Sequence, residues 1–234
     1  MKTFIGVCLC LVLLFLPGIG QANKVPVLMY HHIRDSGWTA SIGKDLSCSP
    51  NIFVKHLDFL EKNGYKTVTF RDAYLGNLPK KAVILTFDDG DADQWFAFTE
   101  MKKRGMVGCF FIVTNFIDGG GFFSSSQIRQ LSNNGMEIGS HSISHPNLTK
   151  LSRKRMSEEI NGSQLILGQL TGKRAITFAY PYGSYNRQVL EEMDKSDYLY
   201  ARTTNEGISN LEDNFCLKIT YIHRGMVDLG RYLK

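Results

Sequence analysis

Short apolar runs alternate with longer amphipathic stretches along almost the whole chain, and this alternation limits the folds that the sequence can adopt. Runs rich in β-branched and aromatic residues predict strands at residues 25–30, 67–70, 82–87, 108–113, 137–140, 176–179, 199–201 and 217–222. Helical spacing predicts helices at residues 52–63, 93–104, 125–134, 152–171, 187–195 and 227–233. A strand-then-helix order favours a parallel sheet with crossover helices. We therefore expect an α/β fold.

The polar motifs of the chain fall directly after predicted strands. Two acids follow the strand at 82–87, and a histidine follows the strand at 137–140. Active sites of α/β barrels are assembled at the carboxyl ends of their strands, so this placement favours a barrel. A nucleotide-binding sheet is disfavoured, because neither of the two glycine-rich phosphate-binding patterns follows any predicted strand.

Two short motifs carry the chemistry of the chain. Residues 86–90 read Thr-Phe-Asp-Asp-Gly, and residues 141–145 read His-Ser-Ile-Ser-His. On one helical turn, an i, i+4 spacing would put both imidazoles on the same face. Two histidines and one carboxylate form a metal site with open positions, and the second carboxylate is then a natural general base. Adjacent acids alone often only cap a turn, but the two motifs together predict a metal-assisted hydrolase.

The paired motifs resemble those of the polysaccharide deacetylases of carbohydrate esterase family 4. The likeness extends from about Val25 to the C-terminus, and residues 26–32, Pro-Val-Leu-Met-Tyr-His-His, are similar to the start of the branch that includes bacterial poly-N-acetylglucosamine deacetylases. The resemblance implies a distorted (β/α) barrel with about seven parallel strands. It also implies a divalent metal ion and the hydrolysis of N-acetyl groups on a glycan.

Carried over position by position, the resemblance assigns roles to five residues. Asp88 is the expected general base. The expected metal ligands are Asp89, His141 and His145. Tyr182, in the segment Tyr-Pro-Tyr-Gly, is expected to offer its backbone N–H to the developing oxyanion.

Two positions depart from the family pattern. The third family motif usually carries an arginine that pairs with the base aspartate, and this chain has Ala179 there. Three basic residues are candidates to replace it: Arg202, Arg174 and Lys218. The last family motif is Leu-x-His, whose histidine acts as general acid. Residues 221–223 read Tyr-Ile-His, so His223 is the matching position for a catalytic proton donor.

We expect a secreted, metal-dependent deacetylase that hydrolyses N-acetyl groups of an N-acetylglucosamine-containing glycan. One divalent metal ion is expected, with zinc as the first choice and cobalt, nickel or iron as alternatives. The same motifs serve deacetylases of chitin, peptidoglycan and xylan, so these substrates stay open. A non-catalytic glycan-binding protein of the same fold is a further alternative, because the motif arginine is missing. A non-haem iron oxygenase is disfavoured by the adjacent acids and the strand–helix order.

The N-terminus predicts a secretory signal peptide over residues 1–22, followed by the deacetylase domain over residues 23–234. Lys2 precedes an apolar run at 4–16, and residues 20–22, Gly-Gln-Ala, suit a cleavage site. The apolar run is shorter than the ~20 residues that span a bilayer, which argues against an uncleaved anchor. The expected location is the periplasm or the medium.

The basic residues are scattered, although the formal net charge is +5. Scattered charge in a secreted chain argues against a nucleic-acid partner and is compatible with loose association with anionic polymers of the cell envelope. The expected partner is therefore an acetylated polysaccharide. The sequence does not indicate an oligomeric state.

Histidines and cysteines outside the motifs have less specific interpretations. His31 and His32 follow the first strand, and they either line the cleft or have a structural role. His56 is expected on the surface of its helix. Cys109 is expected to be buried in a strand as a small hydrophobic residue, and a Cys48–Cys216 bridge stays open.

Overall fold

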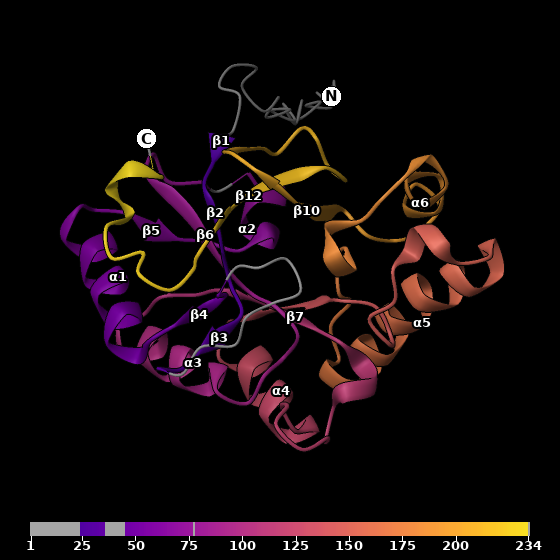
Figure 1. Cartoon of the computed structure of the whole chain (residues 1–234), viewed down its shortest axis with the longest axis horizontal. Coiled ribbons are helices and arrows are strands. Elements are labelled where there is room, and N and C mark those ends of the chain that lie inside the picture. Colours follow the sequence, from indigo (N-terminus) through magenta and orange to yellow (C-terminus); the bar gives the residue numbers. More distant parts are fainter. Residues whose placement is uncertain (1–23, 36–44, 77, 234) are drawn as a thin grey trace, which may run out of the picture.

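A closed ring of seven parallel strands forms the centre of the molecule (Figure 1). The computed structural model describes residues 24–35, 45–76 and 78–233, so the predicted signal peptide at 1–22 lies outside the described residues. In the order of their pairing, the ring strands are β2 (Val27–Tyr30), β12 (Leu217–Tyr221), β10 (Tyr200–Glu206), β9 (Thr177–Ala179), β8 (Glu137–Ser140), β7 (Cys109–Ile112) and β6 (Ala82–Phe87). β6 pairs with β2 and closes the ring. The predicted barrel of about seven parallel strands is confirmed.

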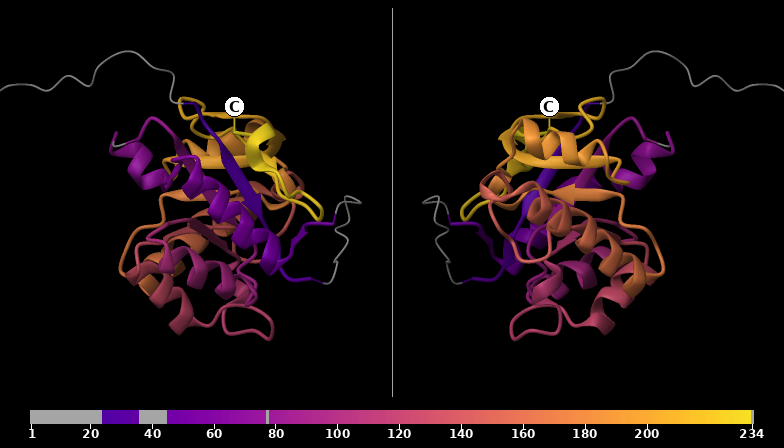
Figure 2. Two further views of the ribbon diagram at one scale, coloured as in Figure 1. Left: turned by 90° about the vertical axis from the view of Figure 1, so that its left-hand side faces the viewer. Right: turned by 90° about the vertical axis from the view of Figure 1, so that its right-hand side faces the viewer.

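Helices surround most of this ring (Figures 1 and 2). They are α1 (Pro50–Lys62), α3 (Gln94–Lys103), α4 (Ser125–Asn133), α5 (Arg153–Thr171) and α6 (Arg187–Met193). No helix connects β10 to β12. There the chain forms β11 (Ser209–Asn210), which pairs antiparallel with β1 (Lys24–Val25). This connection lacks the usual crossover helix, so the barrel is distorted as expected.

Shorter elements connect the main ones. These are β3 (His32–Ile33), β4 (Ser47–Cys48), β5 (Lys66–Thr67), α2 (Phe70–Tyr74) and the 3₁₀ turns η1 (Thr114–Phe116), η2 (Leu148–Lys150), η3 (Pro181–Gly183) and η4 (Leu229–Arg231). β5 pairs with β6 outside the ring. None of the helices in the described part of the chain combines the length and the apolar character needed to cross a membrane.

Two expected elements are largely replaced in the structure, and the strand expected at 199–201 continues to Glu206. The strand expected at 67–70 ends at Thr67, because Thr69 caps α2 instead: its hydroxyl accepts from Asp72 N–H, and the Asp72 carboxylate accepts from Thr69 N–H. This reciprocal pair satisfies two donors at the start of a helix. The helix expected at 227–233 is only the short turn η4.

Side chains alternate between the inside of the barrel and the layer under the helices, as strand geometry requires. Phe111, Cys109 and Ile84 belong to the inner apolar cluster, whereas Phe110 and Phe87 belong to the outer one. Along β6, the inward positions continue from Ile84 through the buried Thr86 to Asp88 at the end of the strand. The alternation thus directs the first acid of the motif toward the barrel axis.

Burial and contacts decide the interpretations of four residues outside the motifs. Cys109 is buried in β7, as expected. Cys48 and Cys216 are both free, so they form no bridge. The expected surface position of His56 is wrong: the side chain is fully buried, and its ring nitrogens bond Tyr30 Oη at 3.1 Å and the Met226 carbonyl at 2.8 Å.

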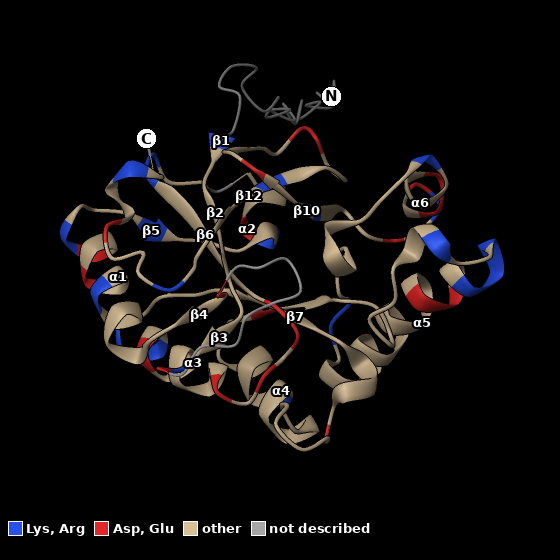
Figure 3. Cartoon of the chain, viewed as in Figure 1, with Lys and Arg blue, Asp and Glu red and all other residues tan. Residues whose placement is uncertain are grey.

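The charged residues of the described chain are unevenly placed. Lys and Arg are spread around the periphery over α1, α5 and α6, and acidic residues follow β6 near the centre (Figure 3). The scattered basic residues fit the sequence expectation. The central acids mark the end of the barrel at which the site lies.

Candidate active site

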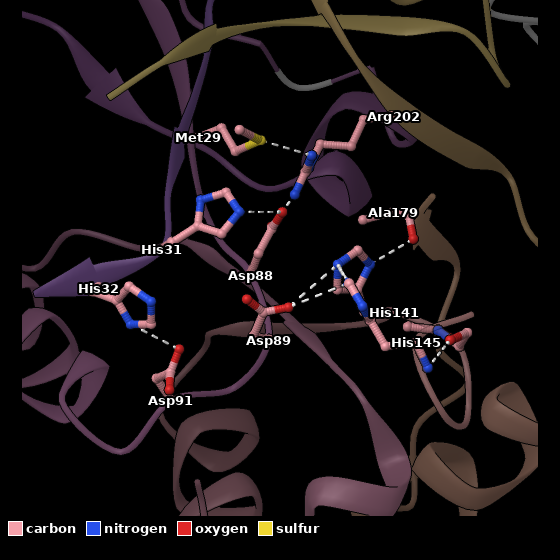
Figure 4. Close-up of polar contacts among 12 residues, drawn as sticks. Met29, His31, His32, Asp88, Asp89, Asp91, His141, His145, Ala179 and Arg202 are labelled. Carbon is pink, nitrogen blue, oxygen red and sulfur yellow. Dashed lines mark hydrogen bonds and ion pairs between the residues drawn. The ribbon is translucent and has the colours of Figure 1, made fainter. Parts of the chain in front are cut away.

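The carboxyl ends of β6 and β8 bring the two predicted motifs together (Figure 4). Asp89 Oδ1 lies 3.5 Å from His141 Nε2 and 3.6 Å from His145 Nε2. The two Nε2 atoms are 3.2 Å apart. The three residues form a cluster that could hold a metal ion, as the sequence predicted.

The donor set fits a small divalent cation. A tetrahedral zinc site with ligands at about 2.0–2.1 Å has ligand atoms about 3.3–3.4 Å apart, close to the three distances in this cluster. His141 Nδ1 lies 2.7 Å from the carbonyl oxygen of Ala179, so the ring donates its proton there and leaves Nε2 free to bind a cation. A hydrogen bond of this kind orients the imidazole ligands of most metal sites.

Burial favours the neutral form of both imidazoles. It lowers the pKa of His141 from 6.5 to about 4, against a smaller opposite effect of the bond to Ala179. Burial is also the main cause that lowers the pKa of His145 to about 4, with a further contribution from His141. Burial raises the pKa of Asp89. At neutral pH the histidines are therefore unprotonated, which is the form that binds metals.

The two histidines do not lie on a helical turn, so that part of the sequence interpretation is wrong. Residues 141–145 form an irregular loop in which Ser142 and His145 have φ values of 68° and 58°. Asp89 and Tyr182 also have positive φ, at 71° and 59°. Non-glycine residues rarely adopt this conformation, and such residues cluster at functional sites. Here the loop, rather than helical spacing, turns both rings toward Asp89.

Asp88 lies in a buried ion pair with Arg202. The carboxylate is 3 % exposed and the arginine 1 %, and Arg202 Nη2 donates to Asp88 Oδ1. The guanidinium also lies over the Phe111 ring, 4.9 Å from its centroid. Its Nη1 lies 3.0 Å from Met29 Sδ (Figure 4). Of the three basic candidates named from the sequence, the structure places Arg202 against Asp88.

The position of Arg202 explains why Ala179 is tolerated. β9 and β10 are parallel neighbours, and Arg202 pairs in register with Ala179. Paired residues of parallel strands point to the same face of the sheet. The guanidinium therefore enters the barrel one strand away from the motif position, beside a small side chain that leaves it room.

Two further side chains, those of His31 and Gln94, contact Asp88 just after β6. His31 Nε2 lies 3.6 Å from Asp88 Oδ2, so His31 lines the site, one of the two interpretations left open. Burial lowers the pKa of His31 well below its usual value. The fully buried Gln94 donates from Nε2 to the carbonyls of His31, at 2.9 Å, and of Asp88. Sequence reasoning missed Gln94, although this polar residue occupies the apolar stripe of α3.

Tyr182 and His223 occupy different surroundings. Tyr182 follows β9 in η3 and is 58 % exposed, with its ring centroid 4.7 Å from that of His145. His223 follows β12, and its Nδ1 lies 2.9 Å from the carbonyl oxygen of Arg224. Among the described residues, no hydrogen bond or ion pair joins His223 to Asp88. The role of His223 as proton donor stays a prediction.

Comparisons with known proteins agree with this arrangement. The family model described as polysaccharide deacetylase matches residues 75–201. The chain is 30% identical to YxkH of Bacillus subtilis (strain 168), a protein that carries the polysaccharide deacetylase designation, over 88% of this chain and 72% of that one. It is 26% identical to the peptidoglycan-N-acetylmuramic acid deacetylase PdaA of the same organism, over 85% of this chain and 69% of that one.

A solved structure shows the same fold. The Streptococcus pyogenes deacetylase PplD, solved in complex with acetate, superposes with a TM-score of 0.83 at 26% identity. The superposition covers 90% of this chain and 98% of that one. The similarity thus extends over the barrel as a whole, beyond the two motifs.

Proposed function

Because this chain belongs to the polysaccharide deacetylase family, we propose that it is a metal-dependent enzyme that removes acetyl groups from an N-acetylglucosamine-containing glycan outside the cytoplasm. Family members hydrolyse N-acetyl amide bonds of carbohydrates, and this chain is a hydrolase of that class. The observation that carries the proposal is the cluster of Asp89, His141 and His145 beside the buried pair of Asp88 and Arg202. The predicted signal peptide supports the location.

The metal site would be formed by Asp89 Oδ1 and the Nε2 atoms of His141 and His145. A divalent cation held there would polarise the acetyl carbonyl and lower the pKa of a bound water molecule. The irregular loop at 141–145 and the bond from His141 to Ala179 fix the direction of the two imidazoles. We favour zinc because the separations among the three ligand atoms are close to those in a tetrahedral zinc site. Cobalt, nickel and iron are the alternatives.

Asp88 is the proposed base. Its position at the inward-facing end of β6 puts its carboxylate next to the metal ligand Asp89. Arg202 binds Asp88 Oδ1, which favours the ionised carboxylate and leaves Oδ2 to take the proton of the attacking water. The backbone N–H of Tyr182 is the proposed partner for the oxyanion, and one such donor typically contributes about 10²–10³ in rate.

The proton for the leaving amine has two candidate donors. His31 Nε2 faces Asp88 Oδ2 at 3.6 Å, so the proton that Asp88 takes from water can pass to this imidazole and then to the amine. His223 matches the family motif position, but its ring bonds the neighbouring backbone. The geometry favours His31. We expect His31→Gln to lower kcat more than His223→Gln, in a comparison of both variants at pH 7.

Several glycans are candidate substrates. The relatives PdaA and YxkH carry names that refer to peptidoglycan and to polysaccharide. Peptidoglycan therefore stands beside poly-N-acetylglucosamine as a candidate substrate. Xylan and chitin follow from the shared motifs alone.

Acetate release tests the proposal directly. Metal-stripped protein is incubated with poly-β-1,6-N-acetylglucosamine, chitin oligomers and peptidoglycan, before and after addition of Zn²⁺, Co²⁺ or Ni²⁺. We expect release only after metal is added, and none from Asp89→Asn. Asp58→Asn is the matched control, because Asp58 is an exposed carboxylate on α1, away from the cluster. A wild-type protein that binds metal but releases no acetate from any of these glycans would favour the non-catalytic glycan-binding alternative.

A further inference from the structure

The loop between the two metal-site histidines adopts a conformation that its own residues do not favour. Ser142 and His145 both have positive φ. Bonds from within the loop and from η1 hold part of it: His145 N–H donates to Ser142 Oγ at 2.9 Å, and Asn115 N–H donates to the Ile143 carbonyl at 2.9 Å. Because non-glycine residues resist this backbone region, the conformation depends on contacts from outside the loop.

The strongest outside contact comes from a buried carboxylate on α5. Glu159 Oε2 accepts from the backbone N–H groups of Ile143 and Ser144, each at 2.9 Å. Glu159 Oε1 accepts from Ser144 Oγ at 2.6 Å. The side chain is 1 % exposed and has one cationic neighbour, Arg155 Nη2, at 3.3 Å. Three donors from two consecutive residues thus converge on one carboxylate, midway between His141 and His145.

The shape of α5 supports the same contact. Gly162 lies one turn after Glu159, and a Cβ atom there would come within 2.7 Å of Ile143 Cδ1. Ser163 Oγ lies 2.6 Å from Ser140 Oγ, at the last residue of β8. Residues 159, 162 and 163 share one face of the helix. That face therefore fits the loop from the end of β8 to Ser144.

We propose that Glu159 is a positioning residue that sets the affinity of the metal site, by holding the 141–145 loop in the conformation that aims both imidazoles at Asp89. The proposal rests on the proposed metal-dependent function. Glu159 forms no hydrogen bond to the three ligand side chains, and it acts through the backbone of Ile143 and Ser144, two of the three residues between the histidines. Partners that orient metal ligands typically change metal affinity by about 10–100-fold when they are removed.

A matched pair of variants on α5 tests this role. Glu159→Gln keeps the size of the side chain but removes its charge, so the bonds to the two backbone N–H groups lose their charge assistance. The amide group that replaces Oε1 can no longer accept from Ser144 Oγ. Glu158→Gln changes the neighbouring carboxylate, which also bonds Arg155, at 2.5 Å, but is only partly buried and makes no hydrogen bond to the loop. Ser144→Ala removes only the hydroxyl bond and leaves both backbone bonds in place.

The measurement is the dissociation constant of Zn²⁺, by competition with a chromophoric chelator at pH 7, starting from metal-free protein. We expect it to rise about 10–100-fold in Glu159→Gln, to stay within about twofold of wild type in Glu158→Gln, and to rise by a smaller factor in Ser144→Ala. The absorption spectrum of the Co²⁺-loaded protein reports ligand geometry, and we expect it to change in Glu159→Gln alone. Thermal unfolding of the metal-free proteins shows whether each variant is folded.

The outcomes separate this proposal from the function on which it rests. If wild type binds Zn²⁺ tightly and Glu159→Gln binds it equally well with the same Co²⁺ spectrum, Glu159 is only structural and the proposal is wrong. If Glu159→Gln does not fold, Glu159→Asp decides, because it keeps the charge but draws the carboxylate back from the N–H groups of Ile143 and Ser144: an unchanged dissociation constant in that variant overturns the proposal. If wild type binds no divalent metal, the proposed metal-dependent function fails as well.

Discussion

The two ends of the barrel each bury a carboxylate, and they surround it in different ways. At the carboxyl end, Asp88 pairs with the guanidinium of Arg202. At the amino end, Glu137 begins β8 and has neutral donors: Oε2 accepts from Arg71 N–H and Oε1 from the Thr177 hydroxyl, each at 2.9 Å. Burial is the main cause that raises the pKa of Glu137.

This difference indicates how one fold uses the same chemical group for two purposes. A buried cation favours the ionised carboxylate, which can then accept a proton. The hydrogen bonds to Glu137 and the nearby charge of Arg71 lower the pKa of this carboxyl group by less than burial raises it. The carboxyl end is thus built for proton transfer, and the amino end is closed by hydrogen bonds. Changes at the two ends should therefore have different effects on catalysis and stability.

The largest expected effect is the loss of the base. Asp88→Asn should lower kcat by about 10²–10⁴-fold, the usual contribution of a general base. Metal affinity should change by less than about threefold, because Asp88 is not among the three cluster residues. Acetate-release kinetics and Zn²⁺ titration measure the two quantities separately. Near-wild-type kcat in this variant would remove Asp88 from the mechanism.

The second prediction concerns the partner of the base. Arg202→Met leaves the Asp88 charge buried without its cation, and breaking a buried pair typically costs about 3–5 kcal/mol in the free energy of unfolding. The double variant Asp88→Asn/Arg202→Met should regain most of this stability and stay inactive. Urea unfolding of the three variants checks this pattern. A double variant no more stable than Arg202→Met would show that the arginine stabilises the barrel without reference to Asp88.

The third prediction is a pH dependence of the metal-free protein. Burial lowers the folded-state pKa of His141 to about 4, so the unfolded chain binds more protons than the folded one between pH 6.5 and 4. Stability should fall as the pH decreases through this window, by on the order of 3 kcal/mol for this group. Chemical unfolding at several pH values measures it. His141→Gln should flatten the dependence, whereas His223→Gln, the control at an only partly buried position, should not.

The smallest effect is expected at the amino end. Glu137→Ala leaves the Arg71 N–H and the Thr177 hydroxyl without their acceptor, which should lower the free energy of unfolding by about 1–3 kcal/mol. The kcat should stay within about twofold of wild type. Glu137→Gln is the control: it keeps an acceptor and carries no charge, so its stability at pH 7 should be at least that of wild type. A large loss of kcat in a folded Glu137→Ala protein would contradict the separation of the two ends.

The sequence predicted the elements that have clear boundaries. The strands at 82–87 and 137–140 match β6 and β8 residue for residue. The first is an apolar run that ends at the two acids, whereas the second, Glu-Ile-Gly-Ser, is marked by the helix-ending Gly135 before it and the histidine motif after it. The strand at 67–70 failed because the capping pair of Thr69 and Asp72 outweighed the local strand preference. A hydroxyl followed three residues later by an acid is a known helix start, so this signal was present in the sequence.

The site was predicted in part. Local motifs identified the metal cluster, because its ligands come from two short segments. The choice of Arg202 required the order of strands in the barrel, which the sequence does not contain. Glu159 and Gln94 were missed, although each is a polar residue within the apolar stripe of its helix. A buried position for such a residue implies a specific hydrogen-bond partner. A polar residue within an apolar helix stripe is therefore a candidate for a role near the site.

The pairing of Ala179 with Arg202 has a consequence for how active sites are recognised across distant relatives. A motif is read along the chain, whereas a barrel presents its functional groups around a ring. The charged side chain can therefore come from the neighbouring strand, 23 positions later in the chain, and still occupy nearly the same place in the site. A search along the chain counts such a residue as lost. A search around the ring finds it, so the loss of one motif residue along the chain does not by itself imply the loss of its charge from the site.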